Sequence, residues 1–147
     1  MRMELITDVS PELREVVQRE LRAFNRAANP DFYAARELPE NAPQPLNLIA
    51  FDESGQPRGG LFGEAFLLWL KIHILTVQAG CRNQGLGTQL MYEAERIALA
   101  RGCQFSYVDT MDYQAPAFYE QLGYTIIGRL PNWDSYGHAK IFLTKTL

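Results

Sequence analysis

Residues 69–110 constrain the fold of this chain more than any other part of the sequence. The β-rich run "WLKIHILTV" leads into a turn with three glycines, "GCRNQGLG", and an amphipathic helical pattern over 85–101 follows. Its apolar residues recur at helical spacing at Leu86, Leu90, Ala94, Ile97 and Ala98. The run "CQFSYVDT" is then typical of another strand. We therefore predict a parallel, right-handed βαβ crossover from 69–77 through 85–101 to 105–110.

The rest of the chain surrounds this crossover with segments of both types. Ser10 and Pro11 are typical of a helix start, and the helix predicted from there should bury one apolar face and stop at Asn29-Pro30. The four prolines between 30 and 45 favour an irregular loop or a short second helix. The other predicted elements are strands at 3–7, 46–52, 59–69, 124–130 and 139–147, and a short helix at 114–123.

This order predicts an α/β fold in a single domain over residues 1–147. We expect a central, twisted and mostly antiparallel sheet, with the parallel βαβ crossover between its fourth and fifth strands and with helices on both faces. The strands 46–52 and 59–69 should form an antiparallel hairpin around a polar turn.

Composition narrows the class of protein. The net charge is −3, so we expect no nucleic-acid partner. The longest apolar run, 65–70, is far too short to span a membrane, and the charged N-terminal residues do not resemble a signal peptide. Cys81 and Cys103 lack the spacing of a metal site and are expected to be reduced thiols. The expectation is a cytoplasmic protein without a metal.

The glycine-rich turn allows three interpretations, since glycines before a helix let an anion approach backbone N–H groups. A P-loop would need a lysine after Gly85, where Leu86 stands. A dinucleotide-binding fingerprint would need a different glycine order after the first strand. The remaining pattern is R-x-x-G-x-G, formed by Arg82, Gly85 and Gly87.

That pattern, together with "APAFYEQLGYTIIG" downstream, resembles the GNAT family of N-acetyltransferases from about Trp69 onward. The resemblance implies acetyl-CoA as co-substrate. It places the pyrophosphate on the turn residues and the pantetheine arm along an open strand edge. The implied contacts are Arg82, Asn83, Gln84, Gly85, Leu86, Gly87 and Thr88 in the turn, and Leu75, Thr76 and Val77 on the strand.

One position departs from the family pattern. Asp112 stands where the family usually has an asparagine that binds the pantetheine arm. An ionised aspartate accepts hydrogen bonds but cannot donate one. Either Gln114 supplies the donor, or this contact differs.

The resemblance also implies catalytic roles. Tyr119 occupies the tyrosine position of the family pattern and would be the acid that protonates the leaving thiolate; the alternative is a tyrosine that only packs in the core. His73 is expected on the same strand face as Leu75 and Val77. It is the candidate base that removes a proton from the amine; the alternative is a histidine with a purely structural role. His138 is a weaker candidate.

The predicted function is an acetyl-CoA-dependent N-acetyltransferase that acts on a primary amine of a small molecule or peptide by direct attack in a ternary complex. The alternative is a non-catalytic module that binds acyl-CoA or a partner protein. The sequence leaves open whether the protein forms a homodimer. We expect the acceptor between the loops 25–45 and 130–138, where aromatic and acidic residues suit a cationic amine or simply cover the core. These residues are Phe24, Phe32, Tyr33, Trp133 and Tyr136, with Asp31, Glu37, Glu40 and Asp134.

Overall fold

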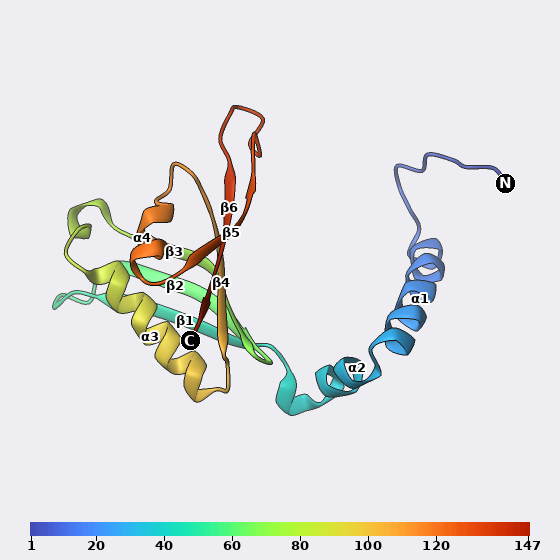
Figure 1. Ribbon diagram of the computed structural model, residues 1–147, viewed down its shortest axis with the longest axis horizontal. Coiled ribbons are helices and arrows are strands. Elements are labelled where there is room, and N and C mark those ends of the chain that lie inside the picture. The colour runs from blue at the N-terminus through green and yellow to red at the C-terminus, as the bar shows by residue number, and fades with distance from the viewer. The chain divides into compact units, whose positions relative to one another are not determined.

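The computed structural model describes all residues from Met1 to Leu147 (Figure 1). The chain divides into two compact units, Met1–Ala42 and Pro43–Leu147. No helix in the structure combines the length and the apolar character that crossing a membrane requires.

The N-terminal unit is helical. Helix α1 spans Pro11–Ala28, and Ser10 Oγ accepts a hydrogen bond from the N–H of Leu13 at 3.2 Å, as the sequence predicts for an N-cap. Asn29 ends α1 and caps α2 (Pro30–Glu37), which is followed by the 3₁₀ turn η1 (Pro39–Asn41). Of the two expectations for this region, the short second helix is therefore the one that forms, with Pro30 as its first residue.

Two expectations for this unit are not met. Residues 3–7 do not form a strand, because a strand needs a partner for its backbone groups and the unit contains no other strand. Within the unit no residue of α1 is buried, because its other helix, α2, has only 8 residues. Its apolar positions are exposed at Leu13, Val16, Val17, Leu21 and Phe24.

The second unit is a six-stranded mixed sheet with strand order β1-β2-β3-β4-β6-β5. The strands are β1 (Gln44–Phe51), β2 (Pro57–Phe66), β3 (Trp69–Val77), β4 (Phe105–Met111), β5 (Thr125–Leu130) and β6 (Lys140–Thr146). Only β3 and β4 pair in parallel, and the other neighbours are antiparallel. The hairpin, the parallel pair and the mixed sheet that the sequence predicts are confirmed.

Helix α3 (Leu86–Ala100) forms the crossover between the parallel strands and contacts β1, β2 and β3 (Figure 1). Its buried face carries Leu90, Met91, Ala94 and Ala98. These residues pack in one core with Leu61 and Leu70 of the sheet. The turn between β3 and α3 contains the 3₁₀ segment η2 (Ala79–Cys81), and the short helix α4 (Pro116–Gln121) contacts β5.

A buried polar network joins α3 to the sheet. Glu95 of α3 is 7% exposed, and its carboxylate accepts hydrogen bonds from the Tyr124 hydroxyl at 3.1 Å and from Lys145 Nζ at 2.7 Å. The Tyr124 hydroxyl also lies 2.7 Å from Ser106 Oγ on β4. Burial raises the pKa of Tyr124, so its phenol stays protonated and remains a donor to Glu95. The network therefore fixes α3 against β4 and β6.

We expect Tyr124→Phe to lower the free energy of unfolding by about 1–3 kcal/mol, because Ser106 and Glu95 each lose a buried partner. Urea denaturation followed by circular dichroism measures this change. Tyr92→Phe is the matched control, since Tyr92 is an exposed tyrosine of α3. Equal stability of the two variants would contradict a stabilising role for the network.

Candidate active site

Strands β3 and β4 separate part-way along their length. Their parallel pairing runs from Trp69 opposite Phe105 to Ile72 opposite Val108 and goes no further, although β3 continues to Val77. On its other side β3 has a register shift against β2, where Ile72 and Ile74 face the consecutive residues Gly63 and Phe62. His73 is thus the extra residue of a bulge, and a bulge bends its strand. The second half of β3 therefore leaves β4 and has an open edge.

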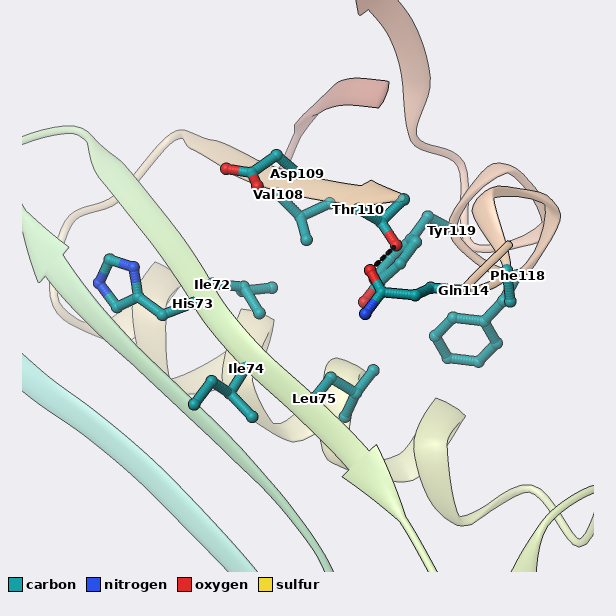
Figure 2. Close-up of a pocket in the computed structure, with 11 residues that line it drawn as sticks. Ile72, His73, Ile74, Leu75, Val108, Asp109, Thr110, Gln114, Phe118 and Tyr119 are labelled. Carbon is teal, nitrogen blue, oxygen red and sulfur yellow. Dashed lines mark hydrogen bonds between the residues drawn. The ribbon is translucent and has the colours of Figure 1, made fainter. Parts of the chain in front are cut away.

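A cavity of about 260 Å³ lies at this separation. In Figure 2 the His73 ring and the Asp109 carboxylate lie toward one end of the view, and Phe118 and Tyr119 toward the other. The strands supply Ile72, His73, Ile74, Leu75, Val108, Asp109 and Thr110, and the α4 region supplies Gln114, Ala115, Phe118 and Tyr119. Both predicted catalytic residues therefore line one cavity.

Tyr119 is 8% exposed, yet its hydroxyl has no hydrogen-bond partner within the protein and is not sealed from solvent. A tyrosine that served only to pack the core would bury its hydroxyl against a partner. Burial and then the charge of Asp109 raise the pKa of Tyr119, so the phenol carries its proton at neutral pH. The residue is placed to donate a proton into the cavity.

His73 lines the same cavity with an exposed side chain. The expectation that it shares a strand face with Leu75 and Val77 assumed regular alternation. The bulge interrupts that alternation, so Leu75 and Val77 pack against the core while His73 does not. His73 remains accessible to a ligand in the cavity.

Asp112 and His138 lie outside the cavity. The Asp112 carboxylate accepts a hydrogen bond from the N–H of Ala139 at 2.9 Å and lies 3.0 Å from His138 Nδ1. The Ala139 N–H, His138 and Arg129 together lower the pKa of Asp112. Asp112 therefore holds the start of β6, and its carboxylate has no part in the cavity wall.

Gln114 does line the cavity. Its Oε1 accepts hydrogen bonds from the N–H of Met111 at 2.8 Å and from Thr110 Oγ1 at 3.2 Å. This orientation leaves the Nε2 donors of Gln114 without a protein partner, and Figure 2 shows them directed into the open space. Gln114 thus offers the donor that Asp112 cannot.

A second cavity of about 400 Å³ adjoins the first, since Ala115 and Phe118 line both. Gly85 has φ +83°, in the region that favours glycine, and no side chain caps the N–H groups that begin α3. Of the predicted cofactor residues, those that line this cavity are Val77, Arg82, Asn83, Gly85, Leu86, Gly87 and Thr88. A helix N-terminus with free N–H groups, a nearby arginine and open space fits a pyrophosphate.

The other predicted cofactor residues lie elsewhere. Leu75 and Gln114 line the first cavity. Gln84 donates a hydrogen bond from Nε2 to the carbonyl of Gly80 at 3.1 Å, within its own turn, and lines neither cavity. Thr76 also lines neither cavity, and it pairs with Gly60 of β2.

Asp109, the cavity's only carboxylate, is not among the residues that the sequence predicts for the site. The signal was present: an aspartate at the carboxyl end of a strand in a parallel βαβ unit, which is where ligands bind in such sheets. The approach of Phe118 to the turn could not be read from spacing.

Residues 11–124 match the model of the Acetyltransferase (GNAT) family. The chain belongs to the GNAT family. It is similar to the blasticidin-S acetyltransferase of Streptomyces morookaense, with 37% identity over 117 residues, covering 77% of this chain and 86% of that protein. These similarities make the protein an N-acetyltransferase.

Solved structures agree with this assignment. A Bacillus cereus acetyltransferase superposes with a TM-score of 0.78 at 28% identity, over 100% of both chains. A streptothricin acetyltransferase of Bacillus anthracis, solved with acetyl-CoA, has the same fold, with a TM-score of 0.65 and 21% identity over 76% of this chain and 70% of that one. The two adjoining cavities of this GNAT protein thus lie within a fold that acetyltransferases share.

The glycine turn gives the first test at the site. A Cβ at Gly87 would lie 3.4 Å from Phe118 and 3.8 Å from Val77, so Gly87→Val fills the wall of the second cavity. We expect CoA to bind at least about 10-fold more weakly, because the branched side chain occupies space beside the helix N-terminus.

Calorimetric titration of the folded variant with CoA measures the change. Gly80→Val is the matched control, because Gly80 belongs to the same turn but lines neither cavity, and a Cβ there meets no atom within 4 Å. Unchanged affinity of Gly87→Val would exclude this cavity as the CoA site.

Proposed function

We propose that the protein transfers the acetyl group of acetyl-CoA to a primary amine of a small molecule, with both substrates bound together. The observation that carries the proposal is the continuity of the two cavities. The helix N-terminus and Arg82 lie in one, and Tyr119 and His73 lie in the other. The blasticidin-S and streptothricin acetyltransferases are named for small molecules, which supports the same acceptor class here.

The residues present suit the binding of acetyl-CoA, which supplies the acetyl group as a thioester and departs as a thiol. The uncapped N–H groups of α3 and the Arg82 guanidinium bind the pyrophosphate. The open edge of β3 at Leu75–Val77 and the free Nε2 group of Gln114 bind the pantetheine arm. The first cavity contains no cysteine or serine to carry the acetyl group, which supports direct transfer to the amine.

The proton transfers fall to two side chains of the first cavity. An alkylamine with a pKa of ~10.4 must lose a proton before it can attack, at a cost of about 4–5 kcal/mol at pH 7. His73 accepts that proton at its imidazole. Tyr119 gives its own proton to the departing thiolate, whose conjugate acid has a pKa of ~8.5. The acid and the base therefore act at different ends of the cavity (Figure 2).

The proposed function is tested by measuring thiol release from acetyl-CoA with a panel of polyamines, aminoglycosides, arylalkylamines and peptides with free N-termini. We expect release that depends on a small amine, and mass spectrometry should identify the amide. Release with peptides alone would replace the small-molecule acceptor with a peptide. No release with any acceptor would favour a module that only binds acyl-CoA.

We expect Tyr119→Phe to lower kcat by roughly 10²–10⁴-fold, because the variant keeps the ring but loses the proton donor. The affinity for CoA should stay within about 2-fold of the wild type, since the Tyr119 hydroxyl makes no hydrogen bond within the protein whose loss would disturb the cavity. Single-turnover kinetics measure the chemical step apart from product release. Tyr92→Phe, on the surface of α3, is the control, and full activity of Tyr119→Phe would leave Tyr119 a packing residue.

We expect His73→Gln to remove the rise of kcat/KM that accompanies deprotonation of the histidine, and to regain activity at high pH. A base acts only when unprotonated, so activity rises with pH until the amine loses its own proton without help. A pH profile of kcat/KM measures both limbs.

His138→Gln is the control for that profile, because His138 is the chain's second histidine and lines neither cavity. A loss in His73→Gln that is equal at every pH would assign His73 to positioning instead.

A further inference from the structure

Asp109 lies on β4 at the point where this strand stops pairing with β3. It directly follows Val108, the last β4 residue with a partner on β3. Along β4 the buried side chains are Ser106, Val108 and Thr110, and the partly exposed ones alternate with them. Asp109 is therefore the first residue of β4 at the separation of the two strands, and its carboxylate lies in the wall of the first cavity (Figure 2).

Each carboxylate oxygen of Asp109 has one partner in the protein. Oδ2 accepts a hydrogen bond from the Tyr107 hydroxyl at 3.0 Å, and Oδ1 lies 2.8 Å from Lys140 Nζ. Burial, followed by the hydrogen bond to Asp109, raises the pKa of Tyr107 to about 12, so this tyrosine remains a donor at neutral pH. A carboxylate offers about four acceptor positions. With 35% of its side chain exposed, Asp109 keeps acceptor positions for a ligand.

The contacts of Lys140 show that the groups around Asp109 can bind an ammonium ion. Its ammonium group lies 5.0 Å from the centre of the Trp133 ring and 5.7 Å from that of Phe142, besides its contact with Asp109. Aromatic faces and a carboxylate are the groups that hold an alkylammonium ion. The side chains next to the cavity therefore already hold one such ion from the protein itself.

We propose that Asp109 binds the ammonium group of the acceptor, and that the acceptors are amines that carry a positive charge at neutral pH. The inference rests on the proposed function and gives it a substrate class. Asp109 holds the amine in the cavity that His73 and Tyr119 also line, and it takes no proton itself. A neutral amine gains nothing from the carboxylate's charge.

Asp109→Asn tests this directly, because asparagine keeps an acceptor for Tyr107 and removes the negative charge. With phenethylamine and spermidine, which are cationic at pH 7, we expect kcat/KM to fall about 10–100-fold, mainly through KM. With aniline, which is neutral at pH 7, the change should stay below about 3-fold. An equal loss with both kinds of amine would overturn the proposal and make Asp109 a structural residue.

A double variant separates Asp109 from its neighbour. Asp109→Asn alone frees the charge of Lys140, which would itself repel a cationic acceptor. In Asp109→Asn with Lys140→Gln both charges are gone, and we expect the loss with cationic amines to persist. Recovery of wild-type kcat/KM in the double variant would overturn the proposal. The matched control is Glu64→Gln, a lysine-paired carboxylate with 33% side-chain exposure that lies outside the cavity.

Ligand-observed NMR of phenethylamine and spermidine with the CoA-bound protein tests binding without turnover. We expect binding by the wild type and its loss in Asp109→Asn, whether or not acetyl transfer occurs. Binding without transfer would count against the proposed function and leave the Asp109 assignment standing. Wild-type transfer to cationic amines whose binding is unchanged in Asp109→Asn would leave the function standing and overturn the assignment.

Discussion

The separation of β3 from β4 after Ile72 and Val108 is the constraint on which the site depends. Parallel strands that stayed paired would close the sheet over the place where the first cavity lies. The bulge at His73 bends β3 away, leaves its edge from Leu75 to Val77 without a partner strand, and exposes Asp109 on the neighbouring strand. A single extra residue in the β2–β3 register thus accounts for the open edge and for the accessibility of the proposed base.

The separation needs support, because two strands that part lose the hydrogen bonds between them. The support comes from α3, which joins the end of β3 to the start of β4 and packs on β1, β2 and β3. The Glu95 carboxylate ties this helix to Tyr124, which directly precedes β5, and to Lys145 of β6. Both strands lie on the side of β4 away from β3. The N-terminus of α3 therefore has a fixed position beside the cavity. A rigid element is what an anion site built from backbone N–H groups requires.

Much of this architecture could be predicted from the sequence, because periodicity and glycine placement act locally. The crossover, the hairpin and the start of α1 at Ser10 are examples. The predictions that were wrong concern residues whose structure depends on partners far away in the sequence. Residues 3–7 have the composition of a strand but no strand to pair with in their unit, and His73 leaves its expected face because of a bulge set by the pairing with β2. The place of Asp109 near the carboxyl end of a strand is visible in the sequence, but the separation of β3 from β4 that exposes it depends on how the strands pair.

Asp112 shows how a departure from a family pattern can be absorbed by the fold. An aspartate in place of the usual asparagine would put an uncompensated negative charge beside the pantetheine arm if its carboxylate faced the cavity. It is instead held by the Ala139 N–H, His138 and Arg129, which lowers its pKa and keeps it ionised away from the site. This fixes the chain at the start of β6, next to Lys140, the partner of Asp109. Asp112 thus fixes the chain beside Lys140, while Gln114 directs its free Nε2 donors into the cavity.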